Sequence, residues 1–242
     1  MREPPLPELA CPQVRAPGAI DGDPHKPPWN ALAPVWLTPS HGRRAEGAPP
    51  TTVALAALAP DAAPLAPRWR FQPTALRVAR DDEHLLVCFH CVDRDASGSY
   101  EGRNQPIYDE EVVEAFLAPG PDPRRYYELE QSPRGAWFEA RIESPYGRRA
   151  TMKVDPAWRC AGWQRAVRLC ADQDGRHAWW CAEWAIPFAA LGAEPPAPGT
   201  RWRANFHRID REGAGQFSAW SPTLAEPPDF HRPDRFGWLV FP

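Results

Sequence analysis

The sequence predicts an all-β protein folded as an antiparallel β-sandwich of the immunoglobulin-like or jelly-roll type, with about ten strands. Short apolar runs separated by turn residues recur along most of the chain, which is the pattern of such sandwiches. The 32 prolines and 16 glycines leave few long helical periods, because both residues interrupt helices. The length of 242 residues suits one large all-β domain.

The chain is expected to begin with an irregular, proline-rich lead-in over residues 1–17 and to continue as a single domain over residues 18–242. One short helical turn is expected at Pro187–Leu191, ended by Gly192. The segments expected to form strands are, in chain order, Val35–Leu37, Thr52–Leu55, Thr74–Ala79, Leu85–Val92, Val112–Leu117, Tyr126–Gln131, Trp137–Ile142, Arg165–Ala171, Ala178–Ile186, Arg201–Ile209, Gln216–Trp220 and Phe236–Phe241.

Leu85–Val92 is the clearest of these strands, because it is apolar at nearly every position, which predicts burial on both faces. It contains Cys88 and Cys91, two of the six cysteines. Residues three apart in a strand point to opposite faces, so this pair cannot easily grip one metal ion or form one bridge. We therefore expect reduced thiols that pack as small hydrophobic groups.

Composition narrows the classes of partner. The net charge of −3 gives no electrostatic argument for binding nucleic acid or an anionic membrane. The sequence contains no run of eighteen apolar residues that could span a bilayer. Because the first residues lack the apolar core of a secretory signal, we expect a cytoplasmic protein, or a secreted one if a leader has been removed.

Alternation along the later strands gathers polar side chains on one face of a sheet. Carboxylate and guanidinium groups on such a face chelate vicinal hydroxyls, and aromatic rings stack on the C–H face of a sugar. The face therefore suits a polyhydroxylated ligand. The alternative is a solvated face with cross-strand Glu/Arg pairs, which contribute about 0.2–1 kcal/mol each. The groups expected on this face are Glu114, Tyr126, Glu128, Glu130, Trp137, Glu139, Arg141, Arg203, Asn205 and His207.

Tryptophans and one loop add further candidates. Trp137, Trp163 and Trp220 are candidates for an exposed stacking platform, whereas Trp180 and Trp184 share the parity of Ala182 and Ile186 and are expected in the core. Glu114 has a structural alternative as the buried partner of Arg208, because an unpaired buried charge is costly. The candidate ligand-binding residues are Arg103, Asn104, Tyr108, Glu114, Glu128, Trp137, Arg203, Asn205, His207 and Trp220.

Two pairs of aspartates are candidate ligands of a calcium ion. Asp93 and Asp95 follow the strand Leu85–Val92, and Asp21 and Asp23 flank a glycine. Closely spaced carboxylates together with loop carbonyls suit Ca²⁺, which takes oxygen ligands in flexible geometry. The alternative is that these short carboxylates cap turns.

A set of segments in this chain resembles the carbohydrate-binding module family 9-like proteins of the DOMON-like sandwich group. The segments are LLVCFHCVDRDAS, IYDEEVVEAFLAP, YYELEQSPRG, WAIPFAAL, RWRANFHRID, AWSPT and DFHRPDRFGWLVF. The resemblance extends over residues 18–242. It implies a non-catalytic sandwich that takes a small sugar, a glycoside or a polysaccharide end between two tryptophans, assisted by Glu, Arg and Asn or Gln, with structural calcium nearby. Fold transfers from such a resemblance more safely than function does.

Two other functions stay open. Paired carboxylates such as Glu128 with Glu130, or Glu114 with Glu139, could serve as the acid and base of a glycoside hydrolase. Some DOMON-like domains hold haem by methionine together with histidine or lysine, and Met152 and Lys153 are present here. Adjacent residues of a strand point to opposite faces, which disfavours a haem site at these two positions.

Overall fold

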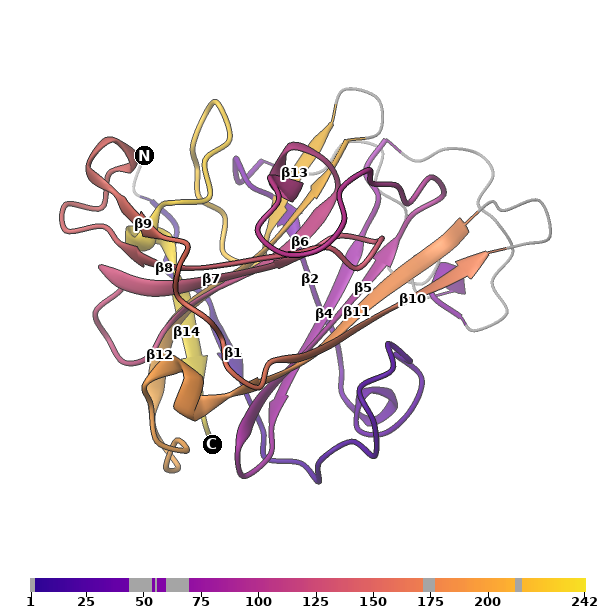
Figure 1. Cartoon of the computed structure of the whole chain (residues 1–242), viewed down its shortest axis with the longest axis horizontal. Helices are drawn as coiled ribbons and strands as arrows, with labels where there is room; N and C mark the ends of the chain where they lie inside the picture. Colours follow the sequence, from indigo (N-terminus) through magenta and orange to yellow (C-terminus); the bar gives the residue numbers. More distant parts are fainter. Residues whose placement is uncertain (1–2, 44–53, 55, 60–69, 172–176, 212–214) are drawn as a thin grey trace.

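The computed structural model describes residues 3–43, 54, 56–59, 70–171, 177–211 and 215–242. Across these residues the chain forms fourteen β-strands in two sheets and five short 3-10 helices. The two sheets lie over each other as two layers (Figure 1). The predicted β-sandwich is therefore confirmed.

The larger sheet has nine strands. The pairing of β1 with β14 is parallel, and its other named pairs are antiparallel. Off the main path, β13 (Gln216–Ala219) pairs with β12 and with β3 (Thr38–Pro39). The main path runs, neighbour by neighbour, through β1 (Glu8–Ala10), β14 (Gly237–Val240), β12 (Arg201–Asp210), β6 (Val112–Ala118), β7 (Arg125–Gln131), β8 (Trp137–Glu143) and β9 (Lys153–Asp155).

The smaller sheet has five antiparallel strands. Their order is β10 (Gln164–Ala171), β11 (His177–Pro187), β5 (His84–Val92), β4 (Thr74–Arg80) and β2 (Val35–Trp36). The 3-10 helices are η1 (Trp29–Ala31), η2 (Ile107–Asp109), η3 (Arg149–Thr151), η4 (Phe188–Leu191) and η5 (Pro233–Arg235). The predicted helical turn is confirmed as η4, and Gly192 ends it with a φ of 64°.

The lead-in is not irregular throughout, because β1 lies within it and joins the larger sheet beside β14. This strand is only three residues long and has proline-rich flanks, so no apolar period in the sequence marks it. The strand expected at Thr52–Leu55 lies outside the described residues, apart from Ala54.

The main hydrophobic core fills the space between the sheets, and β5 illustrates how alternation builds it. Every residue from Leu85 to Val92 is buried, as predicted. Trp180 and Trp184 of β11 are also fully buried in this core, which confirms their expected place. The odd-numbered residues of β5 point into the main core, namely Leu85, Val87, Phe89 and Cys91. The even-numbered residues Leu86, Cys88 and Val92 pack in a second cluster on the outer face of the smaller sheet. Cys88 and Cys91 therefore lie on opposite faces.

The outer face of the larger sheet is also covered. A third apolar cluster forms there between the strands and the chain segments before β6 and before β14, and it contains Ile107, Phe116, Tyr126, Ile142, Phe230 and Phe236. Both faces of this sheet are thus buried in part, and the covering segments form the walls of a cavity.

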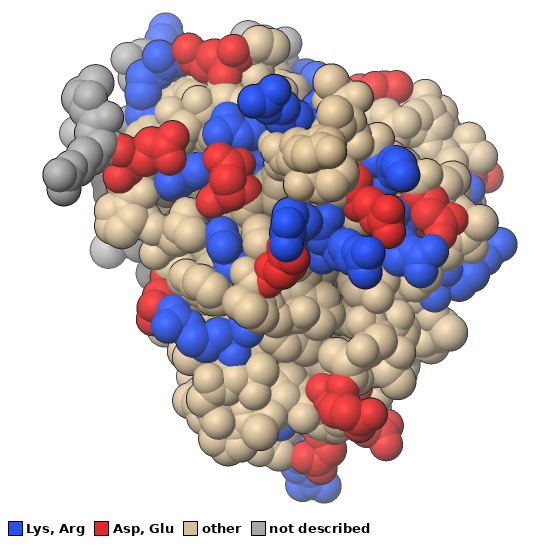
Figure 2. All heavy atoms as spheres, turned by 90° about the vertical axis from the view of Figure 1, so that its left-hand side faces the viewer, with Lys and Arg blue, Asp and Glu red and all other residues tan. Residues whose placement is uncertain are grey.

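The surface carries basic and acidic side chains interspersed with each other, as Figure 2 shows for one side of the molecule. Within the described residues, no helix has the length and hydropathy needed to cross a membrane.

Candidate functional site

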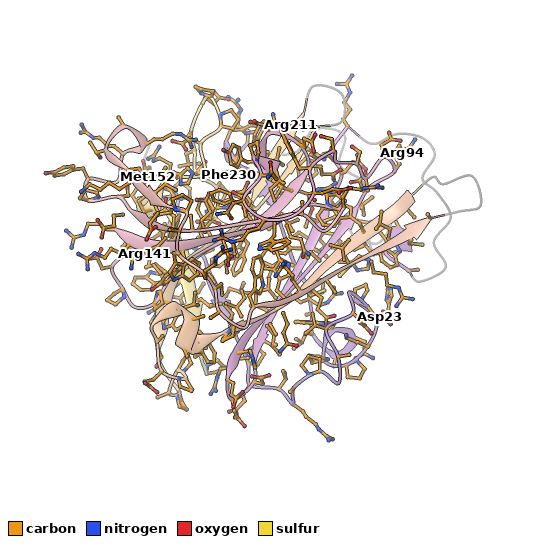
Figure 3. All side chains as sticks on the ribbon, viewed as in Figure 1. Asp23, Arg94, Arg141, Met152, Arg211 and Phe230 are labelled. Atoms are coloured by element: carbon orange, nitrogen blue, oxygen red, sulfur yellow. The ribbon has the colours of Figure 1, made fainter. Side chains whose placement is uncertain are left out.

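A cavity of about 760 Å³ lies on the outer face of the larger sheet. We call it the outer cavity. Strands β6, β7, β8, β12 and β13 contribute lining residues, and so do η2, η3 and the segment 225–232. Met152, Arg211 and Phe230 are among these residues and lie on one side of the larger sheet, whereas Arg141 lies on the other side (Figure 3).

The floor of the outer cavity carries three glutamates, Glu114 of β6 and Glu128 and Glu130 of β7. We call these three residues the glutamate cluster. Each offers one carboxyl oxygen within 4.8 Å of the other two. Alternation explains the grouping, because Glu128 and Glu130 are two residues apart on one strand and Glu130 pairs across with Glu114. All three side chains are buried.

Burial dominates the electrostatics of this cluster. It raises the pKa of Glu130 well above the usual 4.5, and the neighbouring carboxyls of Glu114 and Glu128 raise it further. It also raises the pKa of Glu114 well above 4.5, with Glu128 adding to the effect. No backbone or side-chain N–H or hydroxyl in the described part of the chain donates a hydrogen bond to either oxygen of Glu130.

Two histidines lie beside the glutamate cluster. His207 Nδ1 is 4.0 Å from Glu114 Oε2, and His231 Nε2 is 3.5 Å from Glu128 Oε1. Burial lowers the pKa of His207 well below the usual 6.5 and lowers that of His231 as well. Both rings are therefore neutral at pH 7 and do not compensate the negative charge. His231 Nδ1 is also 2.7 Å from the hydroxyl of Tyr126.

Aromatic rings form the walls of the outer cavity. Tyr108, placed by η2, has an exposed fraction of 42% and packs edge-on against Phe138 with ring centroids 5.8 Å apart. Phe230 stacks on His207 at 4.2 Å with an interplanar angle of 11°. Phe217 of β13 completes the apolar lining near Phe230. These rings offer flat apolar surfaces beside the buried carboxyls.

Arginines stand at the rim, where they are engaged by other groups. Arg149 Nη1 pairs with Asp229 at 3.2 Å. Arg211 Nη2 donates to the carbonyl of Tyr108 at 3.0 Å. Among its lining residues the cavity counts six acidic side chains and three arginines, so its formal charge is negative.

Of the ten predicted ligand-binding residues, Tyr108, Glu114 and Glu128 line the outer cavity. His207 lies next to it, buried beneath Phe230 and beside Glu114. The parity argument grouped Glu114, Glu128 and His207, which do share one face of the sheet, whereas Tyr108 was predicted from its loop. Their role in binding stays a prediction.

Arg203 and Asn205 lie on the predicted face, but their side chains form hydrogen bonds with backbone groups of the segment that covers this face. Arg203 Nη2 donates to the carbonyl of Phe236 at 2.6 Å. The amide of Asn205 donates to the carbonyl of Ser221 at 2.8 Å and accepts from the backbone N–H of Ser221 at 2.9 Å. Neither residue lines the outer cavity, because both are committed to anchoring the chain that covers this face.

Trp163 and Trp220 do not form the exposed stacking platform that was predicted, because both are buried. Trp137 packs against the main core, where the guanidinium of Arg165 lies 3.6 Å from its ring centroid. Trp163 and Trp220 are buried in that core, and the ring of Trp220 occupies the space where Gly237 lacks a Cβ. Glu139 shares the inward parity of Trp137, so Phe138 is the residue of β8 that reaches the cavity.

Arg103 and Asn104 tie their loop to β8 and to the turn after β9. Arg103 Nε pairs with Glu139 Oε1 at 2.5 Å and its Nη2 donates to the carbonyl of Trp158 at 2.7 Å. Asn104 donates to the carbonyl of Pro156 at 2.9 Å and adopts a positive φ of 54°. The structure places both away from the outer cavity.

The predicted pairing of Arg208 with Glu114 is wrong, since Arg208 points to the inner side of the sheet. Its Nη2 contacts Asp93 at 2.7 Å, Glu111 at 2.8 Å and Asp210 at 3.2 Å. These acids have metal-ligand spacing, but the guanidinium already supplies positive charge there. Asp93 also accepts from the indole N–H of Trp180. Asp93 therefore has the contacts of a carboxylate that pairs with a buried arginine rather than those of a calcium ligand.

The second aspartate pair is likewise engaged. Asp21 pairs with Lys26 at 2.6 Å, and Asp23 pairs with Arg168 at 3.1 Å. Asp23 also accepts from the backbone N–H of His25, as expected for turn capping.

Sequence reasoning missed several lining residues, namely Phe138, Arg149, Met152, Arg211, Phe217 and Phe230. Most of them lie in loops or short helices, where no period places a side chain. Phe138 and Phe217 are different, because both lie in strands that were predicted, and for Phe138 only the inward or outward assignment was reversed.

Comparison with known proteins connects this geometry to a family. The model of carbohydrate-binding family 9 matches residues 58–241, about three quarters of the chain. The chain belongs to carbohydrate-binding family 9. No curated protein sequence matches it.

Solved structures share the fold of this family 9 chain. A candidate carbohydrate-binding protein from Bacteroides uniformis has a TM-score of 0.69 at 18% identity, with 98% of this chain and 100% of that chain covered. A family 9 module from Caldicellulosiruptor kristjanssonii in complex with glucose has a TM-score of 0.58 at 12% identity, covering 98% and 96%. Its complex with cellotriose has a TM-score of 0.54 at 13% identity, covering 97% and 93%.

Proposed function

We propose that the outer cavity binds a small sugar, a glycoside or the end of a polysaccharide, and does so without chemical change. The observation that carries this proposal is the glutamate cluster, three buried carboxyls on the floor of a cavity with aromatic walls. Sugar hydroxyls donate hydrogen bonds to carboxylates, and the rings of Tyr108, Phe138 and Phe230 offer faces to sugar C–H groups. Cavities that combine apolar walls with a few polar groups are typical ligand sites.

Membership of carbohydrate-binding family 9 supports this proposal. The structural neighbours from Caldicellulosiruptor kristjanssonii hold glucose and cellotriose, which makes glucose and short glucans the first ligands to test. The cavity is large enough for one or two sugar rings, since ligand pockets typically have volumes of about 300–1,000 Å³.

Hydrolysis is disfavoured by the placement of the carboxyls. A glycoside hydrolase needs its acid and its base or nucleophile on either side of the scissile bond, about 5–9.5 Å apart. The glutamate cluster lies on one wall, because β6 and β7 are adjacent strands. Glu114 and Glu139 point to opposite faces of the sheet and cannot act as a pair.

Two acidic groups in the described residues have the spacing of metal ligands: Asp93 with Glu111 and Asp210, and the glutamate cluster. Arg208 neutralises the first of these groups. A calcium ion is therefore best sought at the glutamate cluster, by comparing ligand binding before and after treatment with EDTA.

The six cysteines are all free thiols, which supports a reducing compartment. We propose that the protein meets soluble sugars or glycosides in the cytoplasm. Its net charge of −3 gives no electrostatic argument for a nucleic acid or anionic membrane partner, and we propose that it has neither.

A glycan array followed by isothermal titration calorimetry with the full chain tests the proposed function. We expect Glu128→Gln to weaken binding about tenfold, since a hydrogen bond to a charged acceptor contributes about 1.5–3 kcal/mol. Glu143→Gln is the matched control, because Glu143 lies outside the cavity and only approaches Arg125 at 3.8 Å. Absence of binding to every glycan on the array would refute the proposal.

A further inference from the structure

The buried glutamates of this protein fall into two groups. Glu111, Glu139 and Glu183 are each paired with a cation: Arg208 at 2.8 Å, Arg103 at 2.5 Å and Lys26 at 2.9 Å. The other three are Glu114, Glu128 and Glu130. Within the described ranges, no lysine or arginine lies within 4.0 Å of their carboxyls. Among the glutamates that the structure describes as buried, all but those on the cavity floor therefore have a cation as partner.

An uncompensated carboxyl cluster is costly for the protein alone. Like charges directly opposite on neighbouring strands destabilise a sheet, and Glu114 stands opposite Glu130. Ionising a buried carboxyl that has no partner costs several kcal/mol, which is why burial raises the pKa of Glu114 and Glu130 well above 4.5. A binding role accounts for their presence, because a bound cation would supply the partner that the chain withholds.

Outside the glutamate cluster, the acidic side chains Asp109, Glu226 and Asp229 balance three arginines in formal charge, so the net negative charge of the lining is that of the cluster. The outer cavity has six acidic side chains against three arginines. Each arginine is already engaged: Arg149 with Asp229, Arg211 with the carbonyl of Tyr108, and Arg232 with Asp234. These guanidinium groups stand at the rim and do not reach within ion-pair distance of the glutamate cluster.

We propose that the ligand of the outer cavity is a sugar bearing a protonated amine, and that the glutamate cluster holds its ammonium group. This inference rests on the proposed function and names its ligand class. An ammonium group has three N–H donors, and the cluster offers three acceptor oxygens that lie within 4.8 Å of one another. In this arrangement the aromatic walls contact the sugar ring, and the glutamate cluster binds the ammonium group.

A neutral sugar and a metal ion fit the same observations less well. Hydroxyl groups satisfy acceptors but leave the negative charge of the cluster in place. A divalent cation compensates the charge but gives no reason for Tyr108, Phe138 and Phe230 to line the space above it. An amino sugar uses both features, and the metal ion becomes an outcome of the test.

Calorimetry with the EDTA-treated full chain tests the inference at pH 7.0 against three matched disaccharides. These are cellobiose, the β-1,4-linked disaccharide of glucosamine, and its N,N′-diacetyl derivative, which keeps the nitrogen but removes the charge. We expect the amine form to bind at least about tenfold more tightly than the other two, because charge-assisted hydrogen bonds are about twice as strong as neutral ones. Glu130→Gln should abolish this preference, and Glu143→Gln should keep it.

The other outcomes separate the two proposals. Equal or tighter binding of cellobiose or of the acetylated form would overturn the amine inference and leave carbohydrate binding intact. Binding of cellobiose that appears only after calcium is restored would assign the cluster to a metal ion and overturn it also. Loss of binding to all sugars would remove the proposed function itself. Should Glu130→Gln fail to fold, Glu128→Gln provides the same comparison.

Discussion

Glu114 and Glu130 stand directly opposite each other on β6 and β7, with both side chains buried in the outer face of the sheet. Two negative charges so placed repel each other and lack water to screen them. The pKa of each carboxyl is raised by burial first and by neighbouring carboxyls second. Ionisation of this pair therefore affects both the stability of the protein and the charge of the outer cavity.

Glu130→Gln is expected to stabilise the protein at alkaline pH. A raised folded-state pKa means that the stability contributed by the neutral carboxyl is present below the unfolded pKa of about 4.5 and is lost as the pH rises through the folded value. Glutamine does not ionise, so its advantage should grow from near zero at pH 4.5 to about 1–3 kcal/mol at pH 8. Urea unfolding at both pH values measures it, and an advantage that shrinks with pH would contradict the account. The charged or titratable groups that face the pair are Tyr108, Asp109, Tyr126, Glu128, Arg149, His207, Arg211, Asp229 and His231.

Binding of an amino sugar should depend on pH in the opposite sense from stability. As the pH rises through the raised pKa values of Glu114 and Glu130, these carboxyls ionise and the affinity of the glutamate cluster for an ammonium group increases. The affinity falls again once the amine of the ligand loses its proton. A neutral disaccharide serves as the control, since its affinity should change far less. Calorimetric titrations at several pH values would show a bell-shaped dependence for the amine alone.

Arg208→Met should destabilise the protein by about 3–5 kcal/mol, because it leaves Asp93, Glu111 and Asp210 without their shared cation. The matched control is Arg141→Ala, whose exposed pair with Asp155 at 2.9 Å is expected to contribute less than about 1 kcal/mol. Urea unfolding at pH 7 compares the two variants. A similar small loss in both would show that the buried network contributes little.

Asn205→Ala separates a binding role from an anchoring role. The side chain makes hydrogen bonds with both backbone groups of Ser221, so its removal leaves buried backbone unsatisfied and should cost about 2–4 kcal/mol. Sugar affinity of the folded fraction should stay within about twofold. Loss of affinity without loss of stability would instead restore Asn205 to the ligand site that the sequence predicted.

Tyr108→Ala and Trp137→Ala form a contrasting pair. Tyr108 lines the outer cavity and is partly exposed, so its truncation should weaken sugar binding about tenfold with little effect on unfolding. Trp137 packs between the sheets beneath Arg165, so its truncation should lower stability by about 2–4 kcal/mol. Paired thermal unfolding and calorimetry check both, and a reversed pattern would place the ligand elsewhere.

Alternation could predict the fold and part of the site because each strand sorts its side chains in two sets. In β12 it placed Arg203, Asn205 and His207 together, and in β7 it placed Glu128 with Glu130. In β8 it placed Trp137, Glu139 and Arg141 on the polar face and Phe138 in the core, which is the reverse of the structure. The reason is that the outer face is itself apolar under its covering loops.

The contacts made by long side chains and by loops could not be predicted from the sequence. Arg208 reaches acids that are 97 and 115 residues away in the chain, and no local pattern marks such partners. Phe230 enters the cavity wall from an irregular segment. Periodicity assigns a face only where the backbone is regular, so these positions required the folded chain.

The parallel pairing of β1 with β14 has a practical consequence for anyone shortening this protein. A fragment that starts at residue 18, or at residue 58 where the family match begins, lacks Glu8–Ala10 and uncovers the outer N–H and C=O groups of β14. Such a bare edge can recruit a strand from another molecule. The trimmed domain should therefore self-associate, whereas in the longer chain β1 covers this edge of β14.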